Sequence, residues 1–165
     1  ATPAPATWRS GWRPVPGLEL DAALYLNDSN VTEPSALVGE IVSNIGREDF
    51  KRLPNIANVT GRVGFSYAGP VSDRSIFELR GFARYVGKST LGIGPILGQL
   101  QGDYIDTGLE MRLGTGSRVF NLSLTNLFDA RGNRFALGSP FLIRDGNQIT
   151  PLQPRTIRLG VELAF

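Results

Sequence analysis

The sequence contains no histidine and no cysteine. Without histidine, the chain lacks the usual general base of enzymes and the commonest metal ligand in proteins. Without cysteine, it forms no disulfide and offers no thiolate to a metal ion. A hydrolase would typically need a Ser–His pair, which this chain does not have. We therefore predict a protein that is not an enzyme and that has neither a cofactor nor a metal site.

Long apolar runs and a charge imbalance are also missing. No stretch approaches the roughly 20 apolar residues of a membrane-spanning helix. Lys and Arg number 17 against 15 Asp and Glu, so the charge of +2 indicates no nucleic-acid partner. Glycine and proline are abundant, at 20 and 11 of 165 residues, which is typical of a chain with many turns. A membrane crossed by strands stays possible, because each barrel strand needs only about 9–11 alternating residues.

Apolar and polar residues alternate with a period of two along much of the chain. Near the end, Leu159, Val161, Leu163 and Phe165 share one parity. Such alternation predicts a strand with two chemically different faces. The same pattern predicts strands over seven ranges: Thr7–Pro14, Leu18–Asn27, Asn58–Tyr67, Ile76–Val86, Asp103–Leu113, Arg118–Phe128 and Thr156–Phe165.

The connections between these strands alternate between short and long. Short turns are expected at Pro14–Gly17, Ala68–Ser75 and Gly114–Ser117, and long connections at Asp28–Ala57, Gly87–Gln101 and Asp129–Pro154. This is the pattern of an antiparallel, up-and-down transmembrane β-barrel, with short periplasmic turns and long extracellular loops. Aromatic residues near both ends of the strands fit two interfacial belts.

Seven is an odd number of strands, whereas single-chain bacterial barrels have an even number. The predicted fold class is therefore all-β, a segment of about seven strands from a larger transmembrane barrel. The C-terminus would be periplasmic and the N-terminus extracellular. We expect the remaining strands to lie on another chain or in a removed portion.

Alternation alone does not say which face is inside. A soluble lipocalin-like barrel or sandwich would turn the apolar face inward. The dense charge on the other face favours a membrane barrel, and the lumen-facing candidates include Arg62, Arg80, Arg84, Asp106, Glu110 and Arg112. Two roles are open for them. Arginines could attract anionic ligands or hold a plug, or the two signs could pair across neighbouring strands and line a wet wall.

Two motifs resemble the end of TonB-dependent outer-membrane receptors. The first is Asn126-Leu127-Phe128-Asp129, and the second is Pro154-Arg155-Thr156-Ile157-Arg158-Leu159-Gly160 leading to the final Phe165. Pro16–Leu20 and Leu53–Asn55 are similar to the preceding hairpins of that family, so the resemblance covers nearly the whole chain. It implies that residues 1–165 are the C-terminal part of a barrel of about 22 strands with a plugged lumen, and that this chain lacks the plug.

The resemblance also implies function and partners. Members of this family import scarce nutrients, such as ferric siderophores, cobalamin or glycans, with energy that TonB delivers to the plug. The implied partners are the remaining barrel strands and the plug domain, TonB acting through that plug, outer-membrane lipid and the nutrient ligand. The implied location is the outer membrane of a Gram-negative bacterium.

The final strand is similar to the signal that the outer-membrane assembly machinery reads, which assigns that role to Arg158, Gly160, Leu163 and Phe165. Ligand contacts are expected on the long loops, around 48–52, 91–101 and 131–145. The alternative is a free-standing small outer-membrane barrel with a structural or adhesive role, which requires at least eight strands.

Overall fold

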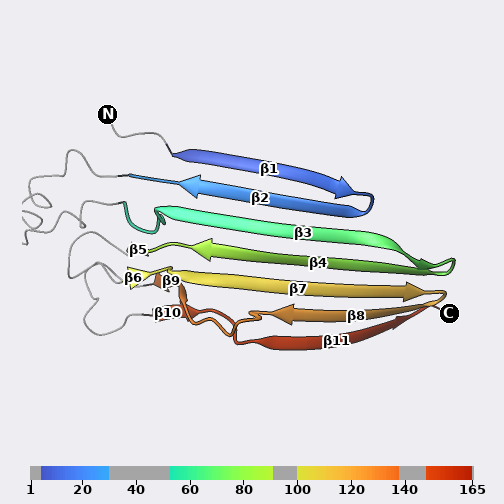
Figure 1. Cartoon of the computed structure of the whole chain (residues 1–165). Helices are drawn as coiled ribbons and strands as arrows, with labels where there is room; N and C mark the ends of the chain where they lie inside the picture. The colour runs from blue at the N-terminus through green and yellow to red at the C-terminus, as the bar shows by residue number, and fades with distance from the viewer. Residues whose placement is uncertain (1–4, 30–52, 91–99, 138–147, 165) are drawn as a thin grey trace, which may run out of the picture.

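A computed structural model describes residues 5–29, 53–90, 100–137 and 148–164. Every regular element in these ranges is a β-strand, and none of the described residues forms a helix long and apolar enough to cross a membrane. Seven strands build one antiparallel sheet in chain order (Figure 1). They are β1 (Ala6–Val15), β2 (Leu18–Leu26), β3 (Val59–Ser72), β4 (Ser75–Val86), β7 (Tyr104–Thr115), β8 (Arg118–Thr125) and β11 (Thr156–Leu163).

The two ends of the sheet differ in how the strands are connected. Two-residue turns at Pro16–Gly17, Asp73–Arg74 and Gly116–Ser117 join strands at one end, which we call the turn end. Gly17 and Gly116 have φ angles of 82° and 56°, a region that glycine enters without steric cost. The strand ends that lead into the longer connections are all at the opposite end, the loop end, where β1 begins (Figure 1). The predicted up-and-down order with alternating connection lengths is confirmed.

The sheet is open. In the described chain β1 pairs only with β2, and β11 pairs only with β8. These seven strands do not close on each other, and each outer strand presents one row of backbone N–H and C=O groups with no strand beside it.

The predicted turn Ala68–Ser75 contains the observed turn but is too long, because Gly69-Pro70 lies within a strand. β3 continues to Ser72, and the chain reverses at Asp73–Arg74. The backbone N of Ala68 donates to Gly17 O at 2.9 Å, so the even-numbered amides of this stretch point towards β2. Because β2 begins at Leu18, no strand lies beside Pro70 on that side. Its missing N–H therefore removes no hydrogen bond from the ladder.

The long connections contain short strands that the sequence did not reveal. β5 (Ser89–Thr90) pairs with β6 (Leu100–Gln101), and β9 (Asn133–Leu137) pairs with β10 (Gln148–Pro151). Strands of two to five residues show too few alternations to stand out in a sequence. The predicted strand 118–128 is also too long, since Asn126 leaves the strand conformation with a φ of 51°.

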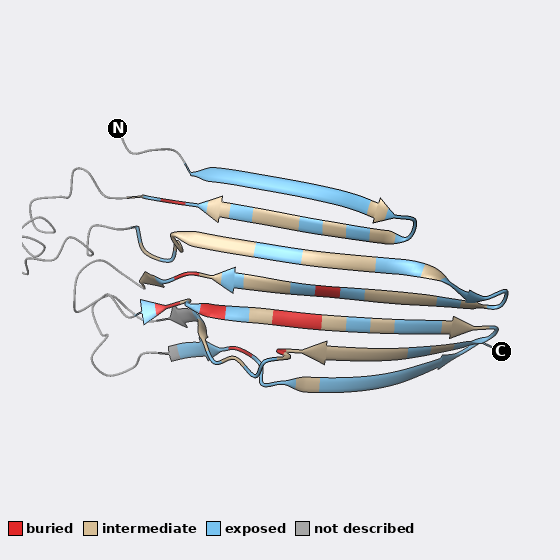
Figure 2. Cartoon of the chain, viewed as in Figure 1, coloured by how far each residue is buried: buried red, intermediate tan, exposed pale blue. Residues whose placement is uncertain are grey.

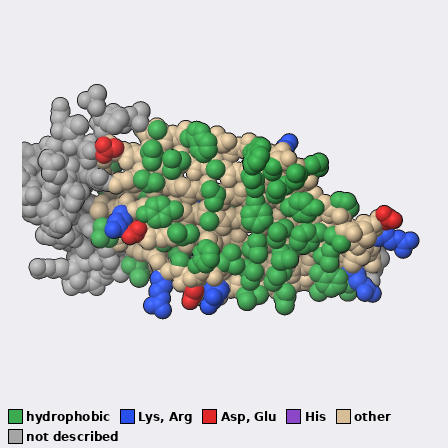
Figure 3. Space-filling view, in the orientation of Figure 1, with side chains coloured by type: hydrophobic (Ala, Val, Ile, Leu, Met, Phe, Trp, Pro, Cys, Tyr) green, Lys and Arg blue, Asp and Glu red, His purple; other side chains and the backbone are tan. Residues whose placement is uncertain are grey.

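The register separates the residues of the sheet into an apolar and a polar face. Along one row of the apolar face, Trp12 lies opposite Leu20, Leu20 opposite Phe65, and Leu109 opposite Leu124. Apolar side chains spread across the sheet in Figure 3. Many are open to solvent, such as Leu159 at 82% and Trp12 at 64% exposure, and Figure 2 shows few buried positions. The sheet is a single layer with no second layer in the described chain to cover it.

Aromatic rings lie over glycines on neighbouring strands, once on each face. A Cβ atom on Gly81 would lie 2.5 Å from Cε1 of Phe65 on the apolar face. A Cβ atom on Gly108 would lie 2.5 Å from Cε1 of Phe82 on the polar face. These close contacts require glycine and pin the register of β3, β4 and β7.

Replacing Gly81 by alanine should lower the free energy of unfolding by about 1–3 kcal/mol, because the ring of Phe65 must move. Gly160→Ala is the matched control, since the atom nearest to its added Cβ, the Cβ of Asn121, is 3.7 Å away. We expect the control to be neutral or slightly stabilising, because alanine loses less conformational entropy than glycine in a strand. Denaturant titration measures the free energy of unfolding of both variants. Equal losses in the two would contradict the importance of the Phe65–Gly81 contact.

Candidate functional site

The charged candidates from the sequence lie together on the polar face. Arg62 comes from β3, Arg80 and Arg84 from β4, and Asp106, Glu110 and Arg112 from β7. In the register, Arg84 lies opposite both Arg62 and Asp106, and Arg80 lies opposite Glu110. Neighbouring antiparallel residues in register share a face. These side chains are up to 50 positions apart in the sequence, and the sheet brings them together on one surface.

Two arginines face each other in the row nearer the loop end. Like charges directly opposite each other are destabilising, but each guanidinium here has a carboxylate partner. Arg62 pairs with Asp21 of β2, and a nitrogen of Arg84 lies 3.4 Å from a carboxylate oxygen of Asp106. The guanidinium of Arg62 also lies 5.6 Å from the centre of the Phe82 ring, within the range of a cation–π contact.

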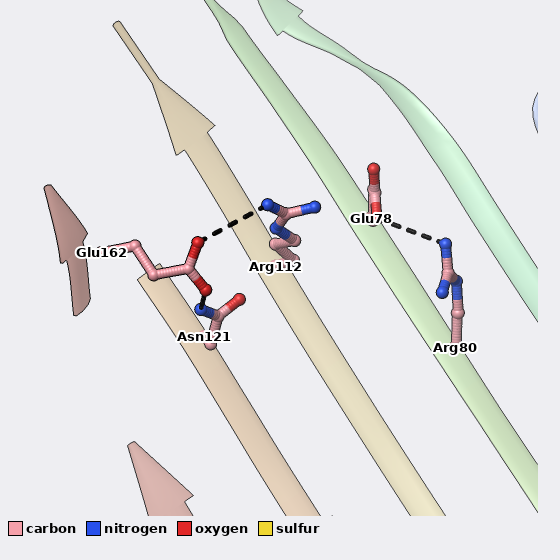
Figure 4. A network of polar contacts seen from close by, with 5 residues as sticks. All are labelled: Glu78, Arg80, Arg112, Asn121 and Glu162. Atoms are coloured by element: carbon pink, nitrogen blue, oxygen red, sulfur yellow. Dashed lines mark hydrogen bonds and ion pairs between the residues drawn. The ribbon is translucent and has the colours of Figure 1, made fainter. Parts of the chain in front are cut away.

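Nearer the turn end, the polar face has a hollow of about 310 Å³. Figure 4 shows polar contacts among the residues that line it. Arg80 pairs with Glu78 at 3.4 Å on the same strand. Arg112 of β7 pairs with Glu162 of β11 at 3.8 Å, and Asn121 of β8, between them, donates to Glu162 at 2.8 Å. The complete lining is Glu78, Arg80, Glu110, Arg112, Asn121 and Glu162.

The ion pairs of this face are mostly exposed and contribute little to stability. The side chains of Arg112 and Glu162 are 48% and 64% exposed. Exposed pairs are typically worth about 0–1 kcal/mol and are screened by salt. Glu110 lies opposite Arg80 but makes no ion pair with the described residues. The hollow therefore presents carboxylate and guanidinium groups to water, as a surface that can bind charged or hydrogen-bonding groups.

The described residues contain no group of acidic side chains arranged to hold a metal ion. The polar face offers both ion pairs and charged groups without an ion-pair partner among the described residues, such as Glu110, which can form hydrogen bonds and further ion pairs.

A second polar centre, at the loop end, is buried. Asn126 is 3% exposed and follows directly after β8. Its Nδ2 donates to the carbonyl oxygens of Ala130 and Gln153, both at 2.9 Å, and its Oδ1 accepts from the Ala130 N–H at 2.8 Å. Its backbone N donates to Thr107 O at 2.7 Å. The side chain of Asn126 thereby joins both ends of the connection between β8 and β11, and its backbone N–H joins them to β7.

Neighbouring contacts join the two motifs that the sequence singled out. Asp129 accepts from the backbone N–H of Arg155 at 3.4 Å, and Thr107 Oγ1 accepts from the Leu127 N–H at 2.9 Å. Sequence reasoning marked Asn126–Asp129 by resemblance but assigned Asn126 no role. The available signal was an asparagine at the end of a strand, because asparagine tolerates a positive φ better than most residues.

The bases of the three long connections are also linked to one another. The Asn55 N–H donates to Thr90 O at 2.7 Å, and Gln101 Nε2 donates to Asn55 Oδ1 at 2.7 Å. The Gly102 N–H donates to Asn133 O at 2.9 Å. The connection after β2 is therefore bound to the one after β4, and that one to the connection after β8.

Three of the four residues expected to form the assembly signal lie on β11, one of the two outer strands of the sheet. Arg158 and Gly160 are on the polar face, opposite Ser123 and Asn121, and Leu163 is on the apolar face, opposite Arg118. Phe165 lies outside the described residues, as do 48–52, 91–99 and 138–145 of the loop segments expected to contact a ligand.

No family model, no curated protein and no solved structure matches this chain. The resemblance to TonB-dependent receptors therefore rests on the motif residues themselves.

Asn126→Ala should loosen the base of the last connection. It removes three hydrogen bonds, and each partner left unpaired costs about 1–3 kcal/mol. Alanine also suffers strain of roughly 1–2 kcal/mol at a φ of 51°. Asn126→Gly is the matched variant, since it loses the same bonds without that strain. Hydrogen exchange at the amides of Leu127 and Ala130 should become faster in both variants, and more so with alanine. Unchanged exchange at both amides would show that Asn126 does not hold this connection.

Proposed function

We propose that this chain forms part of the barrel wall of a TonB-dependent outer-membrane transporter, which imports a scarce nutrient of the ferric siderophore, cobalamin or glycan type. The observation that carries the proposal is the division of seven antiparallel strands into an exposed apolar face and a charged face, with no layer of the described chain packed on either. A wall between lipid and an aqueous lumen requires these two surfaces.

Energetics support this assignment. Apolar surface left in water costs about 25 cal/mol per Å² relative to burial, and the apolar face has many exposed side chains, among them Trp8, Ile157 and Val161. Against hydrocarbon this cost disappears. In a bilayer, however, each unpaired backbone group costs several kcal/mol. The free edges of β1 and β11 must then pair with further strands. In a barrel of about 22 strands, the rest of the barrel supplies them.

The same proposal orients the molecule and assigns its partners. The turn end is periplasmic, and the long connections are extracellular, where the nutrient arrives. The polar face lines the lumen, so that the hollow between Glu78 and Glu162 faces the plug on which TonB acts. No catalytic step is assigned to this chain.

The absence of cysteine allows a direct test of the two faces. Leu122 and Ser123 are neighbours on β8 that point to opposite faces, since Leu122 lies opposite Leu159, and Ser123 lies opposite Arg158. A fluorophore on Leu122→Cys should be quenched by brominated lipid and shielded from aqueous iodide. One on Ser123→Cys should show the reverse. If iodide quenches the Leu122→Cys label and lipid quenches the Ser123→Cys label, the apolar face does not face a bilayer.

Isolation of outer membranes tests the transporter itself. This chain should copurify with a plug-bearing polypeptide or be released from a plug-bearing precursor, and intact mass spectrometry of the purified complex identifies either. The chain on its own, with heat-modifiable migration, would instead indicate a free-standing barrel. Absence of any plug-bearing partner or precursor would overturn the proposed transporter.

A further inference from the structure

The apolar face of the seven-stranded sheet has one charged strand residue, Arg118. Arg118, the first residue of β8, lies opposite Thr115 and Leu163 and shares its face with Phe120. Every other charged residue of these seven strands has the parity of the polar face. Arg118 is exposed and makes no ion pair with the described residues. Among the strand residues, Arg118 is thus the one guanidinium at the turn end of the apolar face, and Asp73 and Arg74 lie in the neighbouring turn between β3 and β4.

An apolar groove begins one row further along the strands. Its volume is about 410 Å³, within the roughly 300–1,000 Å³ of small-molecule sites. Leu113 lies two residues before Thr115, and Val161 lies two residues before Leu163, the two residues opposite Arg118. The first row of the groove is therefore about 7 Å from the row of Arg118. The main apolar lining is Phe77, Leu113, Phe120, Leu122, Leu159 and Val161. The groove extends along the strands, away from Arg118.

Backbone contacts hold the turn beside Arg118 in place. The Gly116 N–H donates to Arg74 O at 3.2 Å, which joins the turn before β8 to the turn before β4. The Ala164 N–H donates to Ser117 O at 2.9 Å, which joins the same turn to the chain after β11. The guanidinium and the groove are therefore carried by connected backbone.

We propose that Arg118 and this groove bind one anionic phospholipid, with its phosphate at the guanidinium and an acyl chain in the groove. The proposal rests on the proposed function, in which the apolar face lies against the bilayer. A guanidinium matches the geometry of a phosphate and binds it with two hydrogen bonds. At the turn end it stands where the headgroups of the periplasmic leaflet lie, and the groove follows the direction in which an acyl chain leaves its headgroup.

Charge complementarity favours a lipid over a second copy of this chain. A second copy that docked its apolar face on the groove would need an acidic residue there to meet Arg118. The apolar rows of the seven strands offer none, and Asp73, the acidic residue of the neighbouring turn, is followed directly by the basic Arg74. An anionic lipid supplies both the negative charge and the apolar chain.

The test uses the protein in its native assembly, reconstituted into phosphatidylcholine vesicles with and without phosphatidylglycerol. Native mass spectrometry then counts the lipids that remain bound after transfer to detergent. Phosphatidylglycerol should be retained in preference to phosphatidylcholine. Arg118→Gln should lower this preference about fivefold, the effect of one basic residue at an anionic membrane surface. Arg118→Lys should give a value between those of Arg118→Gln and the unmodified protein, because lysine keeps the charge but not the two parallel hydrogen bonds.

Two further variants distinguish the contribution of the Arg118 charge to lipid binding from that of the groove. Arg13→Gln removes a cation near the turn end of the polar face, where Arg13 forms an exposed pair with Glu19, and should leave lipid retention unchanged. Val161→Trp fills the groove from an exposed position on β11 and should reduce retention although Arg118 is intact.

The outcomes distinguish this inference from the proposed function. Protein that inserts normally but retains both lipids equally, or an Arg118→Gln variant with unchanged preference, would overturn the lipid site and leave the barrel wall standing. Protein that does not associate with either kind of vesicle would overturn both. A dimer that forms through this face and is lost in Arg118→Gln would assign the groove to a second copy and refute the lipid site.

Discussion

Backbone hydrogen bonds between neighbouring strands hold this fold together, because no second layer of the described chain covers the sheet and the connection after β8 buries only the loop end of β7. The buried apolar residues among those described are Tyr104 and Leu152. Each inner strand is stabilised by two neighbours, whereas β1 and β11 each have one. A single layer of this kind needs its surroundings to supply what a hydrophobic core supplies in a globular domain, and it needs partners for its edges.

Register matters in this sheet more than any single contact. A slip of one residue between two strands would move charged residues such as Arg80 onto the apolar face. The contacts of Phe65 with Gly81 and of Phe82 with Gly108 oppose such a slip, since each ring fits only over a residue without a side chain. The separation of charge from apolar surface, on which the proposed membrane wall depends, follows from these packing constraints. Arg118 is the exception, and it lies where the strand meets its turn.

The polar interactions divide by location. Those of the polar face are exposed ion pairs, which contribute little to stability and leave that surface free to bind other groups. The buried polar residues Asn27, Gln101, Thr107 and Asn126 are all at the loop end, where hydrogen bonds are worth more and are costly to lose. The bases of the long connections are thus held by buried hydrogen bonds, whereas the charged residues on the polar face of the sheet are mostly exposed.

Alternation in the sequence predicted the seven long strands, their antiparallel order and the residues of each face, because a period of two is a local property of the extended chain. The composition of the connections likewise predicted which are short. Other features depend on residues far apart in the sequence. Pro70 continues a strand only because β2 begins at Leu18, and Asn126 gains its role from Gln153 and Thr107. The same holds for the paired charges around Arg112 and for the groove beside Arg118. Both form only when hydrogen bonds align β7, β8 and β11, since no local sequence pattern says which residues of these strands lie opposite each other.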